Sequence, residues 1–177
     1  LAGGGTAGHI SPMVATAEAL RAAEPDVTLT CVGTPKGIES TVVPAAGLEL
    51  TLIPAVPLPR SLPLDLVTMP TRLAGAVLAA RRILKRRRAQ AVVGFGGYAS
   101  LPVYLAARSM GIPVVVHEQN ALPGLANRIA ARFATRGCVK RTEKFRSGWL
   151  TVLPSTGTEM VFAVSPGWNV TAPRLDS

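Results

Sequence analysis

The sequence predicts an α/β fold in which a parallel β-sheet is flanked by helices. Short runs of β-branched and other apolar residues alternate along the chain with longer segments that carry an apolar face at helical spacing, a pattern typical of βα units. Glycine-rich turns directly follow two of the short runs, as happens where a strand passes into a helix. The length of 177 residues accommodates one such domain with some residues to spare.

Four strands are expected, at residues 27–32, 48–53, 91–95 and 113–117. A further strand should open the chain, although only Leu1 and Ala2 of it precede the first glycine-rich turn. Because several strand residues normally come before such a turn, we expect the parent sequence to begin earlier.

The first helix is expected to begin with Ser11 as its cap and Pro12 in its first position, where the missing N–H costs nothing. It should end near Ala23. Three further helices are expected at residues 36–43, 100–110 and 124–133.

The longest helix is expected at about residues 70–88, after an irregular loop rich in proline. Its apolar stripe has helical spacing and consists of Leu73, Val77, Ala80 and Leu84. Beyond Thr135 the apolar pattern weakens. The sequence therefore predicts one domain at residues 1–135 and a tail of unassigned structure at residues 136–177.

The basic charge of the chain is concentrated in this longest helix. Nineteen basic and ten acidic residues give a net charge of +9. Between residues 72 and 88 there are no acidic residues and seven basic ones, namely Arg72, Arg81, Arg82, Lys85, Arg86, Arg87 and Arg88. Such a segment attracts a polyanion, either nucleic acid or an anionic membrane surface, and the alternative is a solvated helix face.

An apolar segment just before the basic helix favours an anionic membrane surface as the partner of this helix. Prolines at 63 and 70, with Asp65 and Arg72, exclude a spanning helix but leave an interfacial one possible. We define the membrane patch as Leu64, Leu66, Val67, Met69, Arg81, Arg82, Lys85, Arg86, Arg87 and Arg88. The alternative is that Leu73, Val77 and Leu84 pack on the sheet while the arginines only face water.

Several classes of site lack their sequence signals. Cys31 and Cys138 are the only cysteines and have no CxxC spacing, so we expect reduced cytosolic thiols rather than disulfides or a zinc site. No Asp-x-Asp pair indicates a divalent cation, and neither a Gly-x-Ser-x-Gly elbow nor a Walker-type phosphate loop is present. We therefore expect neither a metal nor an organic cofactor.

The first motif that carries chemistry is the glycine-rich turn at residues 3–8, just before the first helix. Glycines let the backbone approach a ligand closely, and the N–H groups at a helix start favour a phosphate. The spacing of Gly3, Gly5 and Gly8 matches the dinucleotide fingerprint, but the next strand ends without the acidic residue that binds a ribose. A nicotinamide oxidoreductase is therefore disfavoured, and a tight turn without a ligand remains an alternative.

Two more loops should lie at the same edge of the sheet. Gly94-Phe95-Gly96-Gly97-Tyr98 and His117-Glu118-Gln119-Asn120 each follow a predicted strand, and carboxyl ends of parallel strands form the crevice where open α/β sheets bind ligands. A diphosphate could lie between the glycine loops. His9 and His117 are the only two histidines, and both are suited to proton transfer near neutral pH. Ordinary turns are the alternative for both loops.

Taken together, the segments at 3–12, 94–102 and 117–128 resemble the MurG family of bacterial glycosyltransferases. The resemblance implies a Rossmann-like domain that forms one half of a GT-B glycosyltransferase. It implies an inverting reaction in which N-acetylglucosamine passes from UDP-N-acetylglucosamine to lipid I (undecaprenyl-diphosphoryl-N-acetylmuramoyl-pentapeptide). The product would be lipid II with a β-1,4 bond, made at the cytoplasmic face of the bacterial membrane.

The resemblance also assigns roles to residues of the three loops. His9 is implied as the catalytic residue. Donor-binding positions are Thr6, Ala7, Gly8 and Asn120, and acceptor-binding positions are Gly5, Gly94, Gly96, Gly97, Tyr98, His117, Glu118 and Gln119.

The family's C-terminal donor domain has no counterpart here, so the chain alone is expected to be inactive. The alternative is a nucleotide- or nucleic-acid-binding α/β module without transferase activity. Aromatic residues for base stacking make up only 5% of the chain, which disfavours nucleic acid as a partner.

Overall fold

The computed structural model describes residues 1–56, 63–120, 122–140, 150–153 and 160–163, with the backbone alone for 63–67, 138–140, 150–153 and 160–163. The helices are α1 (Ala7–Ala23), α2 (Glu39–Ala45), α3 (Pro63–Arg86), α4 (Ser100–Ser109) and α5 (Leu125–Ala130). The strands are β1 (Cys31–Gly33), β2 (Leu50–Leu52), β3 (Val92–Gly94), β4 (Val114–Glu118), β5 (Arg136–Lys140), β6 (Leu150–Leu153) and β7 (Met160–Ala163).

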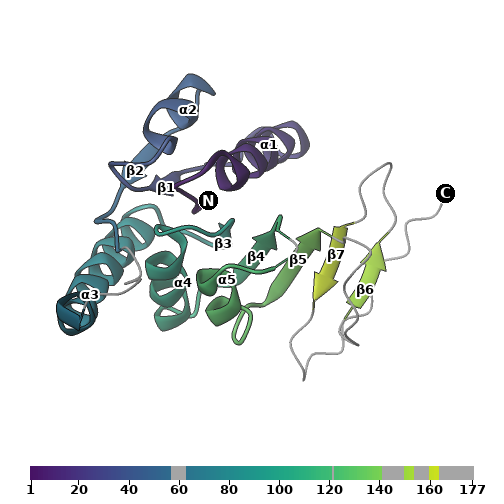
Figure 1. Cartoon of the computed structure of the whole chain (residues 1–177). Coiled ribbons are helices and arrows are strands. Elements are labelled where there is room, and N and C mark those ends of the chain that lie inside the picture. The colour runs from purple at the N-terminus through teal and green to yellow at the C-terminus, as the bar shows by residue number, and fades with distance from the viewer. Residues whose placement is uncertain (57–62, 121, 141–149, 154–159, 164–177) are drawn as a thin grey trace.

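The central sheet is parallel, as predicted. β1 pairs with β2, and β3 with β4 and then β5, all in parallel (Figure 1). Ala2 bridges Val32 of β1 and Gly94 of β3, so the opening residues connect the two groups of strands. β7 and β6 extend the β5 side with antiparallel pairing.

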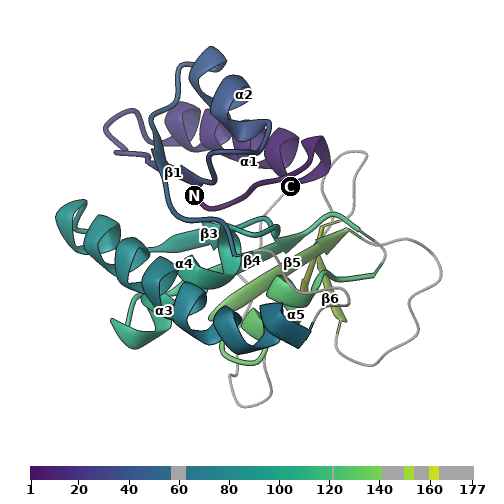
Figure 2. The ribbon, with the colours of Figure 1, turned by 60° about the vertical axis from the view of Figure 1, so that its left-hand side comes forward.

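Two apolar cores lie on opposite faces of this sheet, because successive residues of a strand point to opposite sides. α1 and α2 cover one face, where Ile10, Met13, Cys31 and Phe95 are buried (Figures 1 and 2). α3, α4 and α5 cover the other face. The core there includes Leu84, Val92, Val103, Tyr104, Val114 and Val116.

Three helix starts differ from the prediction. α2 begins at Glu39 rather than near residue 36, and the other two differences concern proline. α1 begins at Ala7 with Thr6 at its N-cap, so Ser11 is not the cap and Pro12 lies inside the helix. Proline removes one helical N–H, whose acceptor would be the carbonyl of Gly8 in the exposed first turn, where water can replace it. α3 begins at Pro63 and carries Pro70 inside the helix.

The start of α3 at Pro63 changes the expected apolar loop into helix. Leu64, Leu66 and Val67 belong to this helix, although their side chains lie outside the described residues. Leu84 is buried, and Leu73 and Val77 pack against the same core, which is the arrangement that the alternative interpretation of this helix expected. No helix in the described part of the chain has the length and apolar character needed to cross a bilayer.

The sheet continues past the predicted boundary at Thr135. β5 runs from Arg136 to Lys140 and pairs in parallel with β4, with Val115 beside Arg136. The apolar pattern of this strand is interrupted by Arg136, Gly137 and Lys140, which is why periodicity alone left it unassigned.

Candidate functional site

The three predicted loops meet at the carboxyl edge of the parallel sheet. They follow Ala2, β3 and β4, which lie side by side in the order Ala2, β3, β4. A cavity of about 440 Å³ opens between the first two loops and the start of α5. Its lining consists of Gly4, Gly5, Thr6, His9, Val56, Gly97, Tyr98, Leu101, Pro102, Gly124, Leu125 and Ala126.

The first loop turns sharply at Gly5 and then starts α1. Gly5 has a φ of +90°, which favours glycine, and Thr6 returns to an extended conformation with φ −140° and ψ 155°. The Thr6 side chain caps no backbone N–H of the helix. Its Oγ1 lies instead 2.8 Å from Nδ1 of His9. The N–H groups of Ala7 and Gly8 have no acceptor among the described residues, so this helix start can receive a ligand.

His9 is half-buried beside the cavity and is held by Thr6. Burial lowers the pKa of His9, while the carboxylates of Glu118 and Glu39 oppose that shift in part. The imidazole is therefore mainly neutral at pH 7. If Nδ1 donates its hydrogen to Thr6 Oγ1, then Nε2 is free to accept a proton.

The second loop packs directly on the first. Gly96 and Gly97 have φ values of +93° and +84°. A Cβ on Gly96 would lie 2.9 Å from the His9 ring, and one on Gly97 would collide with the carbonyl of Gly4. The two loops are therefore in backbone contact, with no room for a side chain between them.

A serine at the start of α4 holds the second loop in place. The Gly96 N–H donates to Ser100 Oγ at 3.1 Å. The same hydroxyl lies 2.7 Å from the Gly96 carbonyl and 2.9 Å from the Ala2 carbonyl, to either of which it can donate. Ser100 is fully buried, and its pattern in the sequence did not indicate this role.

The third loop is organised by the buried carboxylate of Glu118. Its Oε1 accepts hydrogen bonds from the backbone N–H of Asn120 at 2.9 Å and from the Asn120 side chain at 3.0 Å. Its Oε2 accepts from the Gly124 N–H at 3.0 Å and from Asn127 Nδ2 at 2.9 Å. Glu118 is 2% exposed, so its place in this structure is to shape the loop that leads into α5.

Asn127 and Tyr104 connect this loop to the core. The Tyr104 hydroxyl donates to Asn127 Oδ1 at 2.8 Å, and Asn127 Nδ2 also reaches the His117 carbonyl at 3.0 Å. Burial raises the pKa of Tyr104 far above its usual value, so its hydroxyl remains a donor. A Cβ on Gly94 would collide with the Tyr104 ring. Close packing against this ring therefore explains why position 94 is a glycine. Asn127 lies inside the segment at 117–128 that carries the family resemblance. Its role in connecting the loop to the core is visible only from its contacts in the structure.

The predicted site residues divide into those that line the cavity and those that support it. Gly5, Thr6, His9, Gly97 and Tyr98 line the cavity. Gly96 and Asn120 lie in the adjoining loops instead, and His117 and Glu118 are the last two residues of β4. Burial lowers the pKa of His117, whose ring centroid is 5.3 Å from that of Phe95.

Gln119 differs from its neighbours in the third loop. Both polar atoms of its side chain are buried without a hydrogen-bond partner among the described residues. Among the residues that the structure describes, no group of three or more His, Cys, Asp or Glu side chains is placed so that it could hold a metal ion.

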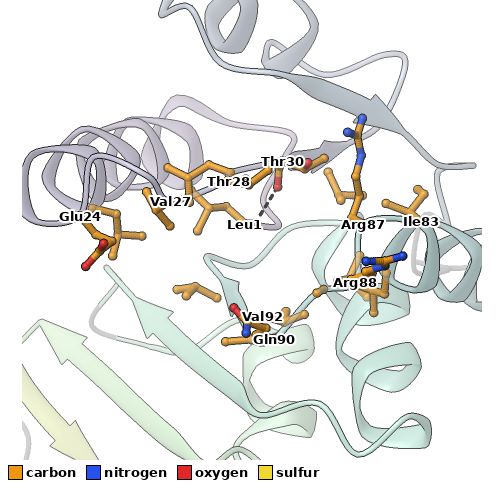
Figure 3. Close-up of a pocket in the computed structure, with 18 of the residues that line it drawn as sticks. Leu1, Glu24, Val27, Thr28, Thr30, Ile83, Arg87, Arg88, Gln90 and Val92 are labelled. Atoms are coloured by element: carbon orange, nitrogen blue, oxygen red, sulfur yellow. Dashed lines mark hydrogen bonds between the residues drawn. The ribbon is translucent and has the colours of Figure 1, made fainter.

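A second cavity, of about 590 Å³, lies at the opposite edge of the sheet, beside the amino ends of β1 and β3. Figure 3 shows Leu1, whose amino group donates to the Thr30 carbonyl at 2.8 Å, with Arg87 and Arg88 on the far side of this space. Arg87 forms an ion pair with Glu49. The loop residues predicted to bind substrate do not line this cavity.

Comparisons with known proteins agree with the three motifs. The chain matches the glycosyltransferase family 28 N-terminal domain over residues 1–139. A protein of Cutibacterium acnes is 63% identical over 134 residues, which cover 76% of this chain and 36% of that protein. A protein of a Nocardioides species is 61% identical over 139 residues, covering 78% and 38% respectively. Both are named UDP-N-acetylglucosamine–N-acetylmuramyl-(pentapeptide) pyrophosphoryl-undecaprenol N-acetylglucosamine transferases.

A solved structure gives the same result for the fold. The crystal structure of Acinetobacter baumannii MurG is similar with a TM-score of 0.69 and 32% sequence identity, over 83% of this chain and 42% of that chain. The present chain therefore spans little more than a third of the length of the curated relatives it matches. The resemblance indicated by the three loops is confirmed, and the chain belongs to glycosyltransferase family 28, whose N-terminal domain it contains.

Proposed function

We propose that this chain is the acceptor-binding half of an enzyme that transfers N-acetylglucosamine from UDP-N-acetylglucosamine to lipid I. Residues 1–135, extended by β5, would form this half, and a second domain would supply most of the donor site. The observation that carries the proposal is the meeting of two glycine loops and His9 at one cavity, in a chain 63% identical to a relative named for this transfer.

The start of α1 supports a diphosphate contact. The N–H groups of Ala7 and Gly8 have no acceptor in the part of the chain that the structure describes, and a helix of 17 residues directs its dipole toward this point. Thr6 would add a hydroxyl. In the proposed complex, Thr6, Ala7, Gly8 and Asn120 contact the donor, while the glycine turn at 96–97 and Tyr98 contact the acceptor.

The geometry of His9 supports a role as general base. The 4-hydroxyl oxygen of the muramoyl sugar attacks the anomeric carbon of N-acetylglucosamine, and UDP leaves with the electron pair of the broken C–O bond. The hydroxyl proton passes to Nε2 of His9, while Nδ1 keeps its hydrogen bond to Thr6. Inversion at the anomeric carbon gives the β-1,4 bond. The free N–H groups at the start of α1 would stabilise the negative charge on the diphosphate of the leaving UDP.

An anionic membrane surface is the proposed location of the acceptor, at the cytoplasmic face of the bacterial membrane. All six basic residues of the membrane patch are exposed, and Met69 is half-buried. Arg87 is partly neutralised by Glu49, and Arg81 donates to Ser109. Arg82, Lys85 and Arg86 form no ion pair with described residues, so their charge is available to lipid headgroups.

The proposal is tested with a hybrid enzyme in which residues 1–139 of this chain replace the matching region of the Cutibacterium acnes relative. We expect the hybrid to release UDP and form lipid II from UDP-N-acetylglucosamine and a short-chain analogue of lipid I. The unaltered relative serves as the control. A hybrid that folds but forms no lipid II, under conditions where the relative does, would contradict the proposal.

A further inference from the structure

A buried carboxylate on α2 accepts hydrogen bonds from two separate loops. The proposed mechanism gives this carboxylate no role. Glu39 is the first residue of α2 and is fully buried. Its Oε2 accepts a hydrogen bond from the Gly5 N–H at 3.0 Å, and its Oε1 accepts from the Thr34 N–H at 2.9 Å and the Thr34 hydroxyl at 2.8 Å. The contact with Gly5 joins residues 34 positions apart in the sequence.

This carboxylate remains charged although it is buried. Burial alone would raise the pKa of Glu39, but the hydrogen bonds from Gly5 and Thr34 outweigh that effect and lower it. Among the described residues, Glu39 forms no ion pair with Lys or Arg. Backbone and hydroxyl donors therefore compensate the charge, and a buried charge without such donors would be strongly unfavourable.

Three glycines leave room for the Glu39 side chain. A Cβ on Gly4 would lie 2.5 Å from Glu39 Oε1, one on Gly33 would lie 2.5 Å from its Cγ, and one on Gly37 would overlap the carboxylate itself. None of these glycines has a positive φ. Their lack of a side chain is therefore explained by the space that Glu39 occupies, and three segments close around this one group.

The segment that Glu39 holds leads directly to His9. The bond to the Gly5 N–H fixes the turn at φ +90° that directs Thr6 and the first turn of α1 toward the cavity. Thr6 in turn contacts His9 Nδ1. On the other side, Gly4 touches Gly97 of the second loop. A shift of the Glu39 contact would therefore move His9 and both glycine loops together.

We propose that Glu39 is a positioning residue of the transfer reaction, which fixes Gly5 and thereby places His9 and the start of α1 against the substrates. This inference rests on the proposed function for its catalytic consequence. The fixing of Gly5 and His9 can be measured on this chain without any substrate.

The test replaces Glu39 by Gln and compares it with Thr34→Val. In Glu39→Gln, the amide oxygen can still face both Thr34 donors, but the NH₂ group then faces the Gly5 N–H, so the Gly5 bond is lost. Thr34→Val removes one hydrogen bond from the same carboxylate and leaves the Gly5 bond intact. Both variants lose stability, which makes Thr34→Val the matched control for a purely structural role.

NMR spectra of the 177-residue chain separate the two roles. The amide proton of Gly5 should move upfield in Glu39→Gln, and the pKa of His9 should fall further because the Glu39 carboxylate raises it. Neither quantity should change in Thr34→Val. Only two histidines contribute imidazole signals, so the His9 titration can be resolved. Unchanged Gly5 and His9 signals in a folded Glu39→Gln variant would overturn the inference.

Hydrogen exchange in the unaltered chain requires no variant and covers the case in which Glu39→Gln does not fold. Gly5 is exposed, yet its amide should exchange slowly because its acceptor is buried. Exchange at the rate of an unprotected loop amide would overturn the inference.

Turnover in the hybrid enzyme tests the catalytic consequence. Glu39→Gln should lower kcat by about 10- to 100-fold with a smaller change in KM, and Thr34→Val should leave kcat near that of the hybrid. A folded Glu39→Gln hybrid with full kcat would refute the positioning role of Glu39 but not the proposed function. An inactive unaltered hybrid would instead refute the proposed function, while the NMR and exchange results still report on Gly5 and His9.

Discussion

His9 illustrates how one side chain depends on neighbours that are close in space and in sequence. Thr6 precedes it by three residues and contacts Nδ1 at 2.8 Å, which is possible because Thr6 is the N-cap of α1 and His9 lies in its first turn. Gly96 comes from a distant loop and leaves space for the ring. Burial lowers the pKa of His9 below its ordinary value of 6.5. These contacts make a neutral imidazole with one free nitrogen at the cavity.

Replacing His9 by Ala should lower turnover of the hybrid enzyme by about 10²- to 10⁴-fold, the range typical of a general base. Ser11→Ala, an exposed change two residues further along α1, serves as the control and should retain turnover. Near-normal turnover of His9→Ala would remove this residue from the mechanism.

The pH dependence of kcat/KM should report the same residue. A base must be neutral, so kcat/KM should fall as pH decreases through the pKa of His9. Because burial lowers that pKa, the fall should occur below pH 6.5. His9→Ala should lose this acid limb. A limb that persists unchanged in His9→Ala would assign the titration to another group.

At the scale of elements, the first and second glycine loops behave as one unit. Gly97 lies against the Gly4 carbonyl, Gly96 lies against His9, and the Ser100 hydroxyl reaches carbonyls of both segments. Parallel strands make this possible, because the residues after Ala2 and after β3 leave the sheet at the same edge. A change in one loop is therefore expected to alter the other.

If the proposed acceptor contact at Gly96 is right, Gly96→Val should abolish binding of the lipid I analogue by the hybrid enzyme, because its side chain would enter the space of the His9 ring. The matched control is Gly111→Val, at a glycine with φ +69° and open space around it. Both changes should destabilise the fold by about 1–3 kcal/mol through backbone strain, with little change in circular dichroism. Unchanged binding by Gly96→Val, or equal loss in both variants, would refute the acceptor contact.

At the scale of the whole molecule, charge and apolar surface are distributed unevenly. One face of α3 packs on the core through Leu73, Val77 and Leu84, and the exposed residues Arg82, Lys85 and Arg86 lie away from that face. Leu125, which lines the cavity, is 46% exposed, and Leu122, before α5 in the chain, is 81% exposed. The proposed membrane contact rests on the exposed charge of α3.

The chain should therefore sediment with vesicles that contain anionic lipid at low salt and be released as salt increases. Replacing Arg82, Lys85 and Arg86 by Glu should weaken this binding by roughly 10²-fold or more, since each basic residue contributes about 1 kcal/mol near an anionic surface. A control with Lys36, Arg128 and Arg132 changed to Glu alters the net charge equally at other exposed positions. Equal binding to neutral vesicles, or equal loss in the control, would show that α3 is not the anchor.

Local pattern was sufficient for the order of strands and helices up to α5 and for the edge at which the site lies, but not for β5, β6 and β7. Apolar periodicity identified the strands before and after each glycine loop, and parallel pairing then placed these loops together. The same reasoning misplaced the starts of α1 and α3, because Pro12 and Pro70 are each accommodated inside a helix. Tertiary packing outweighs the local preference of a single proline.

The sequence by itself determined the fold class, the family and the loops that carry the chemistry, because these depend on residues near one another in the chain. Only the tertiary structure decided what each residue of those loops does. Gly94 makes room for Tyr104, whereas Gly4 makes room for Glu39, and these glycines look alike in sequence. The role of Glu39 depends on a hydrogen bond across 34 residues, and periodicity within a segment contains no information about a contact of that range.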